Sequence, residues 1–222
     1  MAKSAAELAK LREALPDDVG EEMTIRLHRA IRWLGRAEQE TDDVDVRFML
    51  LWISFNALYA KDLSGLDNSF KGETHSFFRK IVALDTENQI QNLIWNSFSK
   101  SMRTLLDNKF AYRGYWESIR AGKSNNKWEK GFKYQNEKAL VGISKGLPVV
   151  VLEVVFSRLY TLRNQLVHGG ATHNSSVNRD QIKDGARILE SMVPVMIEII
   201  LQNPYEDFGS ISYPVINNPY RK

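Results

Sequence analysis

The segment at residues 148–170, PVVVLEVVFSRLYTLRNQLVHGG, constrains the fold more than any other part of the chain. Its β-branched start is typical of a strand, but its apolar residues keep helical spacing over four turns, which is too long for an ordinary strand. These apolar residues are Leu152, Val155, Phe156, Leu159, Leu162 and Leu166. Pro148 at the start and Gly169–Gly170 after the end suit the two ends of a helix. The segment therefore predicts a long helix.

Helical periodicity extends through most of the remaining sequence. We expect an amphipathic helix over roughly residues 20–40, and the segment VRFMLLWISFNALYA at 46–60 predicts a central helix that is packed on nearly all sides. Further helices are expected at 73–84 and 86–107, and the last helix should end near Gln202. The predicted fold class is all-α, a helical bundle.

The chain is expected to form a single domain over residues 1–222, because no internal repeat and no linker interrupts it. Residues 108–146 have weak periodicity and several glycine and asparagine residues, so we expect an insertion of short helices and loops there. The tail at 203–222 contains prolines and alternating residues, and we expect it to lie extended over the bundle.

Composition removes several classes of function. The chain has no cysteine, which excludes disulfides, thiolate zinc sites and cysteine nucleophiles. Any imidazole chemistry must use one of four histidines, His28, His75, His168 and His173. The N-terminal residues carry charges every few positions and do not resemble a signal peptide, and no apolar run is long enough to cross a bilayer. We therefore expect a cytoplasmic protein without a membrane partner.

Two polar features of the expected central helix have alternative explanations. The carboxylates of Asp42, Asp43 and Asp45 precede the helix, where they would cap its N-terminus, and metal binding is the alternative. Asn56 lies inside the apolar segment. A buried amide needs partners, so Asn56 would either join two helices or contact a functional site.

Positive charge is concentrated in one part of the sequence. Residues 1–60 hold 8 basic and 11 acidic side chains, whereas residues 100–145 hold 11 basic and 4 acidic ones, a balance of +7. Aromatic residues are interleaved with these cations, a combination that suits single-stranded nucleic acid. The candidate RNA-binding residues are Arg113, Arg120, Lys123, Lys127, Lys130, Trp116 and Trp128. The alternative is a solvated insertion whose aromatic residues anchor it to the core.

The strongest candidate for chemistry is the sequence from Arg163 to His168, in which Asn164 directly follows the arginine. Asn164 and His168 are four residues apart and share one face of a helix. An imidazole can give and accept a proton, and a guanidinium can hold a phosphate through two parallel hydrogen bonds. These groups meet the minimum need of metal-free phosphodiester cleavage. The alternative is a histidine that caps the helix beside a surface arginine.

The stretch LRNQLVHGG resembles the signature of the HEPN superfamily, in which four to six residues separate an arginine from a histidine. The residue after the arginine is commonly asparagine, aspartate or histidine, and Asn164 fits this pattern. The central helix and the closing segment RDQIKDGARILESMVPVMIEIILQN also resemble the large bacterial HEPN proteins of the Apea-like branch. The likeness covers most of residues 20–203 in architecture, although its diagnostic part is short.

This resemblance implies a helical bundle that forms a homodimer with the two motifs facing each other. It also implies a metal-independent endoribonuclease of a bacterial toxin, stress or defence system, with RNA as substrate, an antitoxin or defence protein as a further partner, and no cofactor. His168 would be the general acid and base, Arg163 would stabilise the phosphate, and Asn164 would orient one of them. The alternative within this resemblance is a non-catalytic HEPN module that binds RNA or a protein.

Overall fold

The computed structural model describes residues 2–60, 70–97, 101–122, 127–176 and 179–213. Within these ranges the regular structure is helical and contains no β-strand, which confirms the predicted all-α class. No helix in the described part of the chain is long and apolar enough to span a bilayer.

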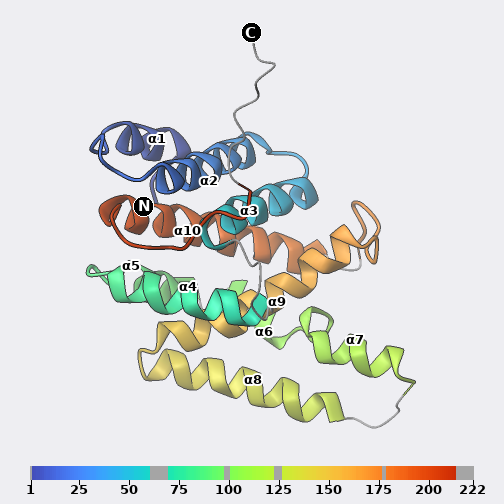
Figure 1. Cartoon of the computed structure of the whole chain (residues 1–222). Coiled ribbons are helices and arrows are strands. Elements are labelled where there is room, and N and C mark those ends of the chain that lie inside the picture. The colour runs from blue at the N-terminus through green and yellow to red at the C-terminus, as the bar shows by residue number, and fades with distance from the viewer. Residues whose placement is uncertain (1, 61–69, 98–100, 123–126, 177–178, 214–222) are drawn as a thin grey trace.

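The helices stack in layers, which Figure 1 shows from the N-terminal helices down to the middle of the chain. The outer layer contains α1 (Ala5–Glu13) and α2 (Glu21–Gln39), and α3 (Val44–Tyr59) packs beneath α2 together with α10 (Arg179–Gln202). The next layer contains α4 (Phe70–Leu84), α5 (Gln89–Ser97), α6 (Arg103–Asp107) and α9 (Pro148–Val167). A short 3₁₀ turn, η2 (Lys109–Ala111), leads into the last layer, α7 (Arg113–Arg120) and α8 (Lys127–Ser144).

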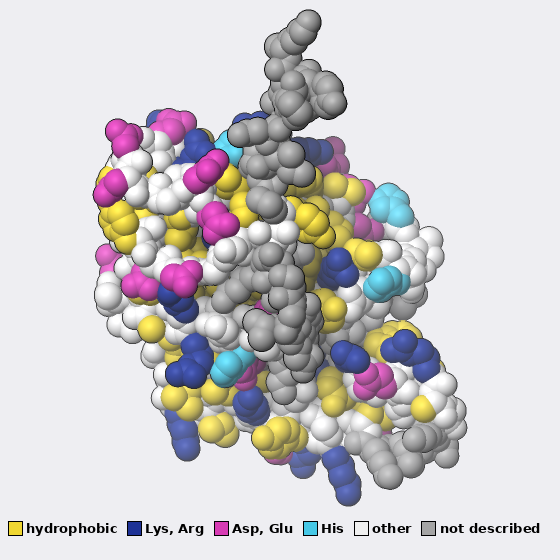
Figure 2. All heavy atoms as spheres, in the orientation of Figure 1, with side chains coloured by type: hydrophobic (Ala, Val, Ile, Leu, Met, Phe, Trp, Pro, Cys, Tyr) yellow, Lys and Arg dark blue, Asp and Glu magenta, His cyan; other side chains and the backbone are white. Residues whose placement is uncertain are grey.

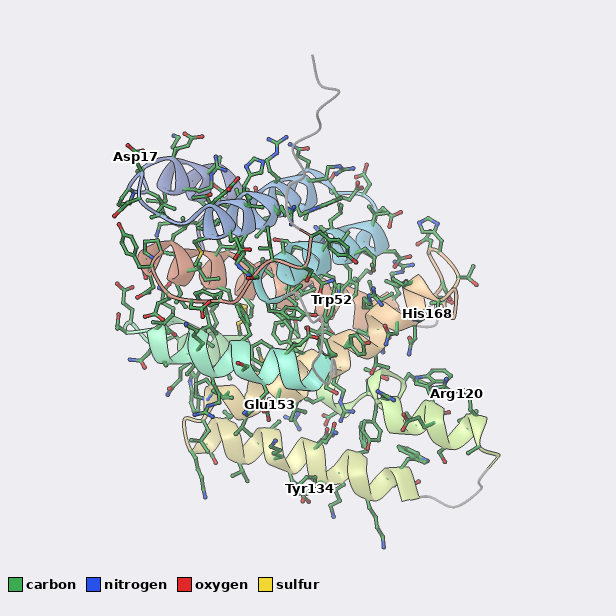
Figure 3. The ribbon with its side chains drawn as sticks, viewed as in Figure 1. Asp17, Trp52, Arg120, Tyr134, Glu153 and His168 are labelled. Atoms are coloured by element: carbon green, nitrogen blue, oxygen red, sulfur yellow. The ribbon has the colours of Figure 1, made fainter. Side chains whose placement is uncertain are left out.

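The core lies where α3 meets α4, α9 and α10. The ring of Phe55 packs against those of Phe78 and Phe156, with centroid separations of 6.1 and 4.5 Å. Trp52, labelled in Figure 3, is also buried there. The apolar stripe predicted for α9 from Leu152 to Leu162 is fully buried. Burial of these large side chains is the main favourable contribution to folding, at about 1.5–3 kcal/mol for each one.

The ends of α9 agree with the sequence prediction. Pro148 is its first residue, where the missing amide proton would have no partner in any case. The helix ends at Val167, and Gly169 adopts a left-handed backbone with φ of +65°. Its amide donates to the carbonyl of Leu166 at 3.2 Å, so the glycine closes the last turn.

The expectation of short helices and loops at 108–146 is wrong for α8, which is one helix of 18 residues. Its glycines do not break it, because they allow close contact with other elements. A Cβ on Gly131 would lie 2.5 Å from the hydroxyl oxygen of Tyr112, and one on Gly142 would lie 3.0 Å from Val151. The expected single helix at 86–107 is described as two elements, α5 and α6, and residues 98–100 between them lie outside the described ranges.

The described part of the tail, residues 203–213, packs against the N-terminal half of the chain. Phe208 and Ile211 are buried, and the carbonyl of Gly209 accepts a hydrogen bond from the guanidinium of Arg26 at 2.5 Å. Arg29 donates to the carbonyl of Tyr213 at 2.7 Å. Residues 214–222 of the expected extended tail lie outside the described ranges.

Candidate functional site

The three motif residues lie together at the C-terminal end of α9. The amide of His168 donates to the carbonyl of Asn164 at 3.0 Å, so the two residues stand one helical turn apart, as their spacing predicts. His168 is the residue at which the helix ends, and its side chain is exposed. Figure 3 shows His168 at the tip of α9, away from the core around Trp52. The imidazole is therefore accessible to a ligand or a second protein chain.

Arg163 is half-buried and points its guanidinium at its neighbour in the motif. Its Nη1 donates to Oδ1 of Asn164 at 3.0 Å, so in this structure the asparagine orients the arginine. Its Nε is buried and has no hydrogen-bond partner among the described residues. No ion pair joins Arg163 to a carboxylate in these ranges either. A buried donor without a partner is costly, and Arg163 therefore has hydrogen-bonding capacity that the described residues do not use.

The loop after the motif is held against the start of α3. His173 Nε2 donates to Oδ2 of Asp43 at 2.6 Å, and the amide of Asn174 donates to Oδ2 of Asp45 at 2.8 Å. Arg179, the first residue of α10, binds both carboxylate oxygens of Asp45 at 2.9 and 3.2 Å. These contacts fix the course of the chain that leaves the motif.

Asp43 has the capping role that the sequence suggested. Its Oδ1 accepts from the amides of Asp45 and Val46 at 2.9 and 3.1 Å, at the first turn of α3. The hydrogen bond from Val46 is the main reason that the pKa of Asp43 lies below its ordinary value, and His173 contributes in the same direction against the opposing effect of burial.

The oxygens of Asp43 and Asp45 and a ring nitrogen of His173 lie within 4.8 Å of one another, which is close enough for a shared metal ion. However, Asp45 already holds the guanidinium of Arg179 with both oxygens, and Asp43 holds the first amides of α3 and His173. A cation would have to displace Arg179 and a helix cap. This donor set fits the anchoring of a loop better than it fits a divalent cation.

A hydrogen bond to a backbone carbonyl joins the segment of high positive charge, residues 100–145, to the motif. The carbonyl oxygen of Phe110 in η2 accepts from Gln165 Nε2 at 2.7 Å and from Trp116 Nε1 at 2.7 Å. Gln165 lies between Arg163 and His168 in sequence, so this pair of hydrogen bonds joins the motif to α7. In Figure 3, α7 lies beside the motif end of α9, with Arg120 at the far end of α7.

The two tryptophans of this segment pack between helices, whereas Lys109, a cation of the same segment, lies over two other rings, 5.3 and 5.4 Å from the centroids of Phe110 and Tyr115. Trp116 and Trp128 are half-buried, and both rings make edge contacts with Tyr115, at 5.3 and 5.1 Å between centroids. The rings thus join α7 to α8. The cations of Arg113, Arg120 and Lys130 are exposed, and Arg113 forms an ion pair with Glu117 at 2.6 Å. Lys123 and the side chain of Lys127 lie outside the described residues.

The surface charge follows the sequence pattern. Figure 2 shows acidic side chains gathered over α1 and α2, and many of the lysine and arginine side chains at the opposite end of the molecule, over α7 and α8. The exposed cations of α7 and α8 therefore lie at the end of the molecule opposite the acidic side chains of α1 and α2.

The remaining polar residues singled out from the sequence lie elsewhere. Asn56 Oδ1 accepts from the hydroxyl of Tyr59 at 2.9 Å within α3, and burial raises the pKa of Tyr59. His28 contacts Arg12 at 2.6 Å on the α1–α2 side, and His75 on α4 bonds to Glu153 on α9. Within the described ranges, Asn56, His28 and His75 form these hydrogen bonds with residues other than Arg163 and His168.

The candidate site is thus an exposed imidazole, a guanidinium without a carboxylate partner in the described ranges, and an amide that orients the guanidinium. Sequence reasoning found all three residues but missed the contacts of Asp43 and Asp45 with the loop, because these join residues about 130 positions apart. No family model, curated protein or solved structure matches this chain.

Proposed function

We propose that this chain is a metal-independent endoribonuclease of the HEPN type that works as a two-fold homodimer. The observation that carries the proposal is the arrangement of Arg163, Asn164 and His168 at the exposed end of α9. Asn164 holds a guanidinium that has no carboxylate partner among the described residues, and the accessible imidazole of His168 follows Asn164 by one helical turn. These are the groups that cleavage of a phosphodiester requires when no metal takes part.

The 2′-hydroxyl of the RNA is the nucleophile in the proposed reaction. One His168 accepts the proton of this hydroxyl, whose oxygen attacks the adjacent phosphorus, and the bond from phosphorus to the 5′-oxygen breaks. A second histidine gives a proton to the leaving 5′-oxygen, and Arg163 stabilises the charge that develops on the phosphate. The products are a 2′,3′-cyclic phosphate and a free 5′-hydroxyl.

A dimer supplies the second histidine. The motif of one chain contains a single imidazole, whereas the reaction uses an acid and a base. Because His168 is exposed at the tip of α9, two copies can bring their motifs together around a two-fold axis through residues 160–175. Sedimentation at micromolar concentration should show a dimer, and a strictly monomeric protein would contradict this part of the proposal.

The RNA would lie across the exposed cations of α7 and α8 on its way to the motif, because these helices are joined to the motif through Phe110. A role in a bacterial toxin, stress or defence system, with an antitoxin or defence partner, is the biological setting that the resemblance implies.

The decisive experiment incubates the purified protein with mixed RNA and with DNA of matching sequence, with and without a chelator. RNA cleavage should survive the chelator and leave 2′,3′-cyclic phosphate ends, and the DNA should stay intact. His168→Ala should lower the rate on the order of a hundred- to ten-thousand-fold. Arg163→Lys should also lower it, because an ammonium lacks the two-pronged geometry of a guanidinium.

The matched controls are His28→Ala and Arg32→Lys, which change the same residue types at exposed positions of α2, outside the motif and outside the proposed RNA surface. Both proteins should remain active. An active His168→Ala protein, cleavage of DNA or an absolute need for a divalent cation would each overturn the mechanism. RNA binding without cleavage would identify the chain as a non-catalytic binding module.

A further inference from the structure

Three cationic side chains stand in one column at the start of α10. Arg179, Lys183 and Arg187 follow each other at four-residue intervals, so each is turned by only about 40° from the previous one. They line an open hollow of about 740 Å³ between the first turns of α10 and α3. Arg47 of α3 adds a fourth cation to this lining, and His173 of the preceding loop also lines the hollow.

Two of these cations are available to a ligand. Lys183 is exposed and forms no ion pair with any described residue. Arg187 donates from Nη1 to the buried carboxylate of Asp184 at 3.2 Å, but its own side chain is 64% exposed, so the rest of its guanidinium faces solvent. Arg179 is engaged with Asp45, and Arg47 lies 3.1 Å from Glu190.

The hollow also has an acidic side, formed by Asp42 and Asp43. The oxygens of Asp43 accept hydrogen bonds from the first amides of α3 and from His173, so this carboxylate does not form an ion pair with the lysine or arginines of the column. The lining therefore contains four Lys or Arg cations and two carboxylates, and three of these cations also pair with Asp45, Asp184 or Glu190, which leaves Lys183 without an ion pair among the described residues. An anion with several charges spread along its length fits this column better than a single small ion, because the cations are strung out along the helix.

The hollow lies next to the candidate site. His173 lines it and follows His168 by five residues, a length of chain that spans at most about 18 Å. In Figure 3 the loop that leads into α10 lies above His168, and α7 lies below it. The loop whose His173 lines the hollow and the helix α7 are thus on two sides of the motif.

We propose that Lys183 and Arg187, at the mouth of this hollow, bind the phosphate backbone of the RNA strand on the side of His168 that α7 does not cover. The proposal rests on the nuclease function proposed above and adds a second contact surface to it. A guanidinium and an ammonium at this spacing can each neutralise one phosphate without reading the base sequence. The strand would then be held on both sides of the bond that is cut.

The test measures RNA binding in proteins that carry His168→Ala, so that the RNA stays intact. The probe is a labelled single-stranded RNA of mixed sequence, titrated over a range of salt concentrations. The variant is Lys183→Glu with Arg187→Glu, and its matched control is Lys10→Glu with Arg32→Glu, which changes the net charge equally at exposed positions of α1 and α2. A milder pair, Lys183→Gln with Arg187→Gln, covers the case in which the new carboxylates disturb α10.

The α10 variant should bind at least about tenfold more weakly than the control. Its plot of log affinity against log salt should be shallower by about 1.4, because each phosphate contact to a single strand contributes roughly 0.7 to that slope. The glutamine pair should show the same loss of slope with a smaller loss of affinity. Equal affinity and equal slope in the variant and the control would overturn the proposal.

The nuclease function and this surface can fail separately. If the protein with His168 intact cleaves RNA but the α10 variant binds like its control, the surface proposal is wrong and the nuclease function stands. If nothing is cleaved but the α10 substitutions still weaken binding, the surface is right and the chain is a binding module. If the protein neither cleaves nor binds RNA, both proposals are overturned.

Discussion

The molecule contains two deeply buried arginines whose guanidinium groups are compensated by different kinds of partner. Arg26 on α2 is 1% exposed and Arg158 on α9 is fully buried, and neither forms an ion pair with a described carboxylate. Arg26 donates to the carbonyls of Leu58 and Gly209 at 2.7 and 2.5 Å, with longer bonds to two further carbonyls. Its charge is thus spread over oxygen atoms of the backbone.

Arg158 has far fewer polar partners. Its guanidinium lies 4.5 Å from the ring centroid of Tyr112 and 4.9 Å from that of Phe132, and it makes one hydrogen bond, to Asn136 at 3.1 Å. Its Nε and Nη1 have no partner among the described residues. Burial lowers the pKa of both arginines, and lowers that of Arg158 to about 10.

Arg26 and Arg158 therefore attach neighbouring elements to each other in two different ways. Arg26 satisfies carbonyls that would otherwise be buried without partners, so it joins α2, α3 and the tail firmly. Arg158 fixes η2 and α8 to α9 mainly through the faces of two rings, at the expense of two unsatisfied donors. The layer of α7 and α8, which carries the proposed RNA-binding cations, should therefore be the less stable part.

The largest effect is expected for Arg26→Met. The substitution leaves several buried carbonyls without a donor, each of which costs about 1–3 kcal/mol, so the free energy of unfolding should fall by roughly 3 kcal/mol or more. Arg26→Lys keeps some donors and should cost less than Arg26→Met. Urea unfolding of both proteins measures the two values, and a loss below about 1 kcal/mol for Arg26→Met would remove the contrast with Arg158.

For Arg158 the order of the same two substitutions should be reversed. Methionine removes a buried charge with unsatisfied donors and still fills the space between the rings, so Arg158→Met should change the stability by about 1 kcal/mol or less. Arg158→Lys keeps the buried charge without the planar group that stacks on the rings, and should be more destabilising. A smaller loss of stability for Arg158→Lys than for Arg158→Met would contradict the proposed difference between Arg158 and Arg26.

Hydrogen exchange compares the two regions directly in the unmodified protein. Amides of α7 and α8 should exchange through openings that need less free energy than those of α2 and α3, because fewer buried contacts hold the former. Arg26→Met should abolish much of this difference by weakening the α2–α3 side. Uniform protection across all four helices would show that the bundle opens only as a whole.

The smallest effect is a pH dependence at Glu153 on α9, which accepts from Lys138 of α8 at 2.9 Å and bonds to His75 of α4. Burial alone would raise its pKa, but Lys138 and His75 outweigh burial, and the pKa lies below its ordinary value. The stability that Glu153 provides is therefore present above about pH 4.5 and is lost as the pH falls through the lower folded value.

Solvent screening reduces this contribution to a few tenths of a kcal/mol. Glu153→Gln should accordingly unfold with a shallower dependence on pH between about 5 and 3 than the unmodified protein, as measured by thermal melts. An identical slope in the two proteins would show that the carboxylate does not link α8 to α9 through its charge.

The sequence was sufficient for elements whose signal is local. The ends of α9 follow from Pro148 and Gly169, and the helical spacing of its apolar residues predicted its buried face. The extent of α8 could not be predicted in this way, because Gly131 suggests a loop until the ring of Tyr112 is known to lie against it. The contacts of Arg158 could not be predicted either, because the rings that it contacts, those of Tyr112 and Phe132, belong to other parts of the fold.

The candidate site shows the same limit. Arg163, Asn164 and His168 stand close in sequence and could be found from it, whereas the anchoring of the following loop by Asp43 depends on a contact across the fold. The column on α10 is different, because Arg179, Lys183 and Arg187 are spaced by four residues and a helical projection would have revealed it. Only its position beside the motif required the structure.

The hydrogen bond between Arg26 and Gly209 also has a consequence for synthesis of the chain. The two residues are 183 positions apart, so the guanidinium cannot form this hydrogen bond until the ribosome has added 183 further residues. At about 5–20 residues per second this delay is on the order of ten to forty seconds. Until then, α2 carries a cation in the middle of an apolar face, and the N-terminal layer cannot reach its final state. The segment at residues 203–213 therefore completes the folding of the N-terminal layer.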